Sequence, residues 1–156
     1  MVHKMTAADV IETYQVRGAI EGYATTQIAK DYQTPQAQQT IQKLLEISER
    51  QKQLLETSPF DVNTFTDVDH LFHTTIVSYM NNENFSELFD NHMYRIHMFA
   101  IDSFKYPVRP QEALAEHSAI LSAIQKGDVP AVYEATLFHM EAPQKIMLER
   151  IAKEEA

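Results

Sequence analysis

Apolar residues recur at intervals of three and four along almost the whole chain, the spacing that places them on one side of an α-helix. No run shows the sustained alternation of apolar and polar residues that is typical of a half-buried strand. The pattern therefore predicts an all-α fold, an antiparallel bundle in one domain over residues 7–152. The predicted helices cover about residues 7–30, 35–56, 63–79, 84–103 and 111–126, and a sixth begins at residue 129.

Local signals mark where several of these helices begin and end. Thr34 followed by Pro35 is typical of an N-cap and the first helical position. Gly127 suits the residue that follows a helix C-terminus, where a left-handed backbone is common, and Asp128 suits the next N-cap. These residues predict a tight connection between the last two helices.

Four ionisable residues interrupt the apolar sides of the helices. Asp69 and His73 are four residues apart, so their side chains share one face of a helix. His117 and His139 fall on the apolar stripes of two other helices. A divalent cation would satisfy a buried carboxylate and three buried imidazoles together, which makes these four residues candidate metal ligands. The alternative, for each residue taken singly, is a core side chain that is hydrogen-bonded to a neighbour.

The residue types restrict the metal. The chain has no cysteine, so thiolate ligands and disulfides are excluded. Imidazole nitrogens with one carboxylate suit Zn, Ni, Mn or Fe and do not favour Ca or Mg. We expect Zn, with Ni or Mn as alternatives. Four protein ligands leave little room for a reactive water in tetrahedral geometry, whereas octahedral geometry would leave two open positions.

Two arginines, Arg17 and Arg95, also lie on predicted inward stripes. Guanidinium groups match carboxylates in shape and charge, so both are candidates for binding an anionic effector. The alternative for Arg17 is an internal salt bridge, for example with Glu21 or Glu12.

Pro143 follows His139 by four residues within the last predicted helix. Proline has no backbone N–H, and its ring clashes with the carbonyl four residues earlier. We therefore expect this helix to bend or to be interrupted between His139 and Pro143.

Composition and charge exclude several functions. The net charge is −9, which does not suit contact with a nucleic-acid backbone. The N-terminus has no apolar signal segment and no run of 18 apolar residues exists, so we expect no membrane partner and a cytoplasmic protein. Zincin, nucleophile-elbow, P-loop and dinucleotide-binding motifs are also missing from the sequence.

Three motifs resemble one known family. Residues 69–73 read D-x-x-F-H, and residues 116–128 read E-H-x-x-I-L-x-A-I-x-x-G-D. His139 follows at the expected distance, and residues 16–21 are similar to a V-R-x-x-x-E opening. Together they resemble the FadR-type C-terminal domain (FCD) of GntR-family bacterial transcription regulators, over about residues 10–151.

The resemblance implies a bundle of six to seven helices that binds a small effector. In the metal-binding branch, an Asp and three His hold Zn, Ni or Mn and an organic acid binds beside the ion. Those roles would pass to Asp69, His73, His117 and His139, with Arg17 and Arg95 as effector contacts.

The resemblance also implies a regulator rather than an enzyme, acting as a homodimer. DNA would be bound through a winged-helix domain that precedes this one in such regulators and is missing from these residues. The alternative is a small metalloenzyme that acts on an organic acid.

Overall fold

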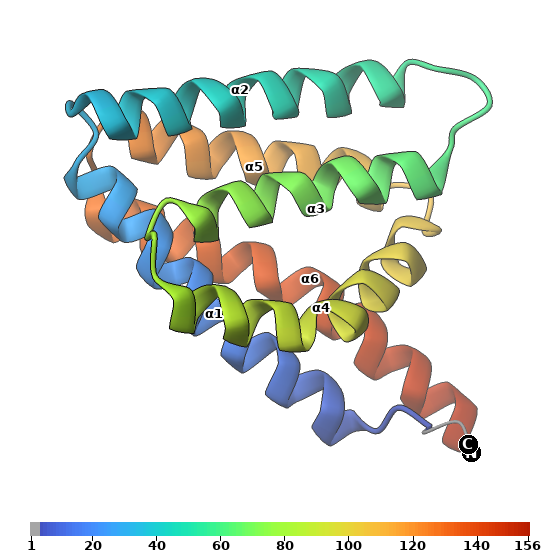
Figure 1. Cartoon of the computed structure of the whole chain (residues 1–156). Coiled ribbons are helices and arrows are strands. Elements are labelled where there is room, and N and C mark those ends of the chain that lie inside the picture. The colour runs from blue at the N-terminus through green and yellow to red at the C-terminus, as the bar shows by residue number, and fades with distance from the viewer. Residues whose placement is uncertain (1–3) are drawn as a thin grey trace.

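The computed structural model describes residues 4–156, and in that range the chain is a bundle of six α-helices without a strand (Figure 1). The fold class predicted from the sequence is confirmed. The helices are α1 (Ala7–Lys30), α2 (Pro35–Leu55), α3 (Val62–Ser78), α4 (Glu83–Phe104), α5 (Arg109–Gln125) and α6 (Val129–Glu155). Within residues 4–156, no helix is long and apolar enough to cross a membrane.

The first and last helices, α1 and α6, form the most extensive contact in the bundle. α5 also lies along α6, and α2 packs against both α3 and α5 (Figure 1). α4 follows α3 and contacts it, and it also reaches α1 and α6. This arrangement encloses the inward faces of α1, α3, α5 and α6.

Side chains at the predicted positions begin the helices. The Thr34 hydroxyl accepts a hydrogen bond from the Ala37 N–H at 3.2 Å, with Pro35 as the first residue of α2. Asp128 Oδ1 accepts from the Ala131 N–H at 3.2 Å at the start of α6. These contacts satisfy N–H groups that have no partner within the helix. The predicted caps at both helices are confirmed.

Polar residues separate two apolar clusters along the bundle. On α1, Tyr14 belongs to one cluster and Ile28 to the other, while Arg17 and Glu21 lie between them in the chain and are buried. On α6, His139 lies between residues of the same two clusters. The polar layer is therefore internal, and its groups must satisfy one another or bind a ligand.

The last helix continues through its proline. α6 runs from Val129 to Glu155 with a buried Pro143 inside it, so the predicted interruption is wrong. The His139 carbonyl still lacks its helical donor, because proline has no N–H. The segment beyond Pro143 places Met147 and Ile151 in an apolar cluster with α1 and α4, and this packing favours a continued helix. A bend at Pro143 remains a prediction.

Gly127 provides a test of the α5–α6 connection. Its φ is +64°, and a Cβ at this position would lie 2.5 Å from Tyr32 Cε1. We expect Gly127→Ala to lower the free energy of unfolding by about 1 to 3 kcal/mol, because the left-handed backbone and the ring both oppose a side chain. Urea denaturation measures this change.

Gly22→Ala is the matched control. Gly22 lies inside α1, and an added Cβ would meet the Tyr133 ring at an ordinary 3.6 Å. Alanine stabilises a helix interior relative to glycine by about 0.5 to 1 kcal/mol. Equal changes in the two variants would contradict this account of Gly127.

Candidate metal centre

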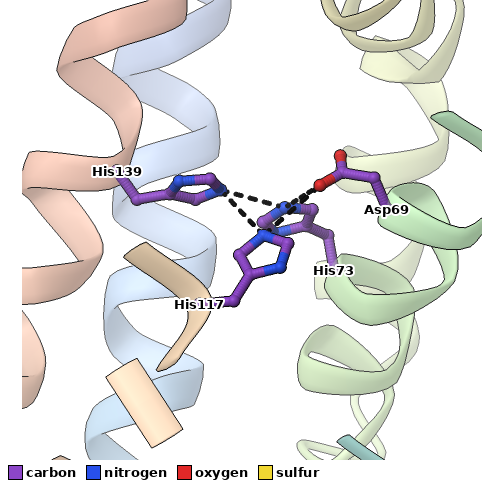
Figure 2. Close-up of side chains that lie close together, drawn as sticks. All are labelled: Asp69, His73, His117 and His139. Atoms are coloured by element: carbon purple, nitrogen blue, oxygen red, sulfur yellow. Dashed lines mark hydrogen bonds and ion pairs between the residues drawn. The ribbon is translucent and has the colours of Figure 1, made fainter. Parts of the chain in front are cut away.

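The structure brings Asp69, His73, His117 and His139 together. One ligand atom from each lies within 4.8 Å of all the others, and all four side chains are buried. Asp69 and His73 extend from α3, where one helical turn places them on the same face, while His117 comes from α5 and His139 from α6 (Figure 2).

The three imidazoles face one another through the same ring atom. His139 Nε2 lies 3.2 Å from His117 Nε2 and 3.2 Å from His73 Nε2. Asp69 Oδ1 lies 3.3 Å from His117 Nε2 and 3.7 Å from His73 Nε2. Figure 2 shows the rings and the carboxylate pointing toward a common centre.

The opposite nitrogen of each ring, Nδ1, contacts an oxygen from a second set of residues. The partners are Glu21 Oε1 for His73, Gln51 Oε1 at 2.9 Å for His117, and Glu116 Oε1 at 2.6 Å for His139. A nitrogen that faces such an oxygen carries the hydrogen and donates it. In a neutral imidazole, the lone pair is then on Nε2. This is the arrangement in which histidine binds a metal.

Two buried arginines hold the two glutamates. Arg17 Nε donates to Glu21 Oε2 at 2.5 Å. Arg109 donates from Nη1 and Nη2 to the two oxygens of Glu116 at 2.7 and 2.8 Å. Burial alone would raise the pKa of Glu21, but Arg17 and the neighbouring histidine lower it to about 2. Glu116 behaves in the same way, with a pKa of about 2, so both carboxylates are ionised at neutral pH.

Burial keeps two of the three histidines neutral. It lowers the pKa of His139 to about 3 and also lowers the pKa of His117. For His73, burial acts in the same direction, but Glu21 and Asp69 outweigh it and raise the pKa. The Nε2 lone pairs of His117 and His139 are therefore free at neutral pH, and a cation would compete with a proton only at His73.

The four residues fit a divalent metal. Bonds of about 2.0 to 2.1 Å in tetrahedral geometry place two nitrogen ligands roughly 3.3 Å apart. The two Nε2–Nε2 separations of 3.2 Å are close to that value. Asp69 Oδ1 is fully buried and makes no hydrogen bond with the described residues, and a cation would satisfy it.

A purely hydrogen-bonded cluster is the alternative. If the Gln51 amide were turned over, its Nε2 would donate to His117 Nδ1, and His117 Nε2 could donate to Asp69. With the amide as it stands, Gln51 Nε2 is buried without a partner among residues 4–156. Amide orientation is assigned from such networks, so metal content is the measurement that separates the two cases.

For two residues of the site, the sequence predicted membership of a motif but no contact. Glu21 and Glu116 are the glutamates of the V-R-x-x-x-E and E-H motifs, and they prove to hold histidines from other helices. Gln51 and Arg109 carry no sequence signal, because a lone polar residue on a helix does not show which distant side chain it meets. Arg17 takes the internal salt bridge that was its alternative, with Glu21.

Arg95 lies at the edge of the bundle. Its side chain is 35% exposed, and its Nη2 lies 3.5 Å from Asp9 Oδ1 on α1. The inward position expected from the sequence is therefore wrong. The side of α4 that carries Arg95 reaches the boundary between α4 and α1, where the side chain is partly exposed. Contact between Arg95 and an effector remains a prediction.

Comparison with protein families identifies the fold. A model of the FCD domain matches residues 12–142. The chain belongs to the FCD domain family. A search of curated proteins found no match. FCD domains are the effector-binding, regulatory domains of GntR-type regulators, so this chain is an effector-binding domain.

His117→Ala tests the metal centre. We expect loss of metal from the purified protein, and loss of the stability that metal provides, which is about 2.7 kcal/mol when free metal is at one hundred times its Kd. Elemental analysis and thermal unfolding with and without chelator measure both effects. His92→Ala is the control, because the one bond that His92 makes within the described part of the chain is to the Leu88 carbonyl on its own helix. Stoichiometric metal in a His117→Ala, His139→Ala double variant would contradict the assignment.

Glu116→Gln tests the outer partners. The variant removes the charge that holds His139 Nδ1–H and pairs with Arg109, so we expect metal affinity to fall roughly 10- to 100-fold. Metal titration measures the change. Glu112→Gln is the control, because Glu112 also lies near Arg109, at 3.5 Å, but is about half exposed and does not bond a histidine. Equal affinities for the two variants would show that Glu116 does not act through His139.

Proposed function

We propose that this FCD domain is a metal-dependent sensor of a small organic acid. The observation that carries the proposal is the convergence of three imidazole Nε2 atoms and Asp69 Oδ1 in a buried site. We propose Zn as the ion, with Ni or Mn as alternatives, because the donors are nitrogen and oxygen only. An ion with more than four coordination positions would keep room for an oxygen of the effector.

The charges around the site favour an anionic effector. Arg17 and Arg109 are balanced by Glu21 and Glu116, and all four side chains are at most 9% exposed. Asp69 offsets one charge of a divalent cation, which leaves one positive charge uncompensated in the interior. A carboxylate would neutralise that charge, and a buried unpaired charge is costly.

Regulation of transcription would follow through a DNA-binding domain. The FCD residues carry a net charge of −9, so we propose that DNA contact belongs to an attached winged-helix domain and that the regulator is a homodimer. The effector would act by binding one arrangement of the regulator more tightly than another. Catalysis is the rival function, because a coordination position that is open to an effector oxygen could also hold a reactive water.

A thermal-shift experiment tests this proposal. We expect malate or citrate to raise the melting temperature of the metal-loaded protein, and EDTA treatment to abolish the effect. Arg17→Lys keeps the charge but loses the guanidinium geometry, so the affinity for the acid should fall. Arg50→Lys on the exposed side of α2 is the control.

Two results would contradict the proposal. The first is a shift with neutral sugars and none with any organic acid. The second is turnover of the acid by the metal-loaded protein, which would establish the enzyme alternative.

A further inference from the structure

Apart from the Gln51 amide, two buried hydrogen-bond donors have no partner within residues 4–156. The Tyr14 hydroxyl is buried and makes no hydrogen bond with the described residues, and the same is true of Arg109 Nε. A buried polar group without a partner costs on the order of 1 to 3 kcal/mol. Such groups are rare in folded proteins and need a ligand or a water to explain them.

Arg17 follows Tyr14 by three residues on α1, so the two buried side chains lie on the same face of that helix. The hydrogen bond of Arg17 within residues 4–156 runs from Nε to Glu21, which leaves the N–H groups of both Nη nitrogens available. The side chain is 5% exposed. Both arginines are therefore anchored by glutamates through one part of the guanidinium group, and the remaining N–H groups are left for another acceptor.

Packing holds the Tyr14 ring in place. The ring stacks on Phe99 with centroids 6.0 Å apart and planes inclined by 22°. Burial raises the pKa of the hydroxyl to about 12, while Arg17 and Arg109 act against that rise and Asp69 adds to it. The hydroxyl is thus within electrostatic reach of both arginines and of a proposed metal ligand. It stays protonated at neutral pH, which makes it a hydrogen-bond donor.

We propose that the Tyr14 hydroxyl, Arg17 and Arg109 together bind the anionic oxygens of the effector. This inference rests on the proposed function and adds two residues, Tyr14 and Arg109, to its site. The ligand class is a small carboxylate, because every free group is a donor and two of the three are cations. A neutral molecule could accept these hydrogen bonds, but it would leave the positive charge of the metal-loaded site uncompensated.

Tyr14→Phe is the decisive variant, because it removes one oxygen and keeps the ring that stacks on Phe99. We expect metal stoichiometry and affinity to be unchanged. We also expect the unliganded, metal-loaded protein to melt no lower than the wild type, since the lost hydroxyl has no hydrogen-bond partner within residues 4–156. The affinity for malate or citrate, measured by calorimetry, should fall roughly ten- to a hundredfold, the usual effect of losing a hydrogen bond to a charged group.

Tyr94→Phe is the matched control, because Tyr94 is 74% exposed. Its acid affinity should equal that of the wild type. If Tyr14→Phe binds the acids as tightly as the wild type does, the inference is wrong and the proposed function stands. A lower melting temperature of the unliganded variant with unchanged acid affinity would also overturn it, because the hydroxyl would then be structural. If the wild type binds no acid, the proposed function fails, and this inference fails with it.

Discussion

The cost of burying charge organises this structure. A carboxylate and three imidazoles meet at one point, and each needs compensation because water cannot reach it. The compensation is arranged in two rings: the Nε2 atoms and Asp69 face inward, and Glu21, Gln51 and Glu116 hold the outer nitrogens. Five of the six helices contribute a residue to this network: α1, α2, α3, α5 and α6. A shift of any of these five helices would therefore disturb the polar layer.

This network explains how a metal and an effector could be linked. Removing a cation would leave three imidazoles and a carboxylate to share protons, and only His73 has a raised pKa. Metal binding and folding are thus expected to support each other. An anion would complete the charge balance from the α1 side, where Arg17 and Tyr14 lie one helical turn apart. α1 forms the most extensive contact of the bundle with α6. A shift of α1 on binding of the anion would therefore alter the contact between these two helices.

The position of α4 differs from that of the other helices. It supplies no side chain to the two rings, but its Phe99 packs on Tyr14, and Arg95 at its edge pairs with Asp9 of α1. α4 thus covers the ring of Tyr14, whose hydroxyl is one of the unpartnered donors. Its contribution is apolar packing and partly exposed ion pairs, such as Arg95 with Asp9 and Asp102 with Arg150, and pairs of that kind add little stability.

The sequence by itself determined the helices, several of their ends and the four inward ionisable residues. These features depend on local rules: apolar spacing, capping at Thr34 and Asp128, and a glycine with positive φ at residue 127. Only the tertiary structure showed that Gln51 and Arg109 belong to the site, since a residue's partner on another helix is not encoded in its own neighbourhood. The tertiary structure also decided that α6 continues through Pro143, because packing of the following segment outweighs one lost hydrogen bond.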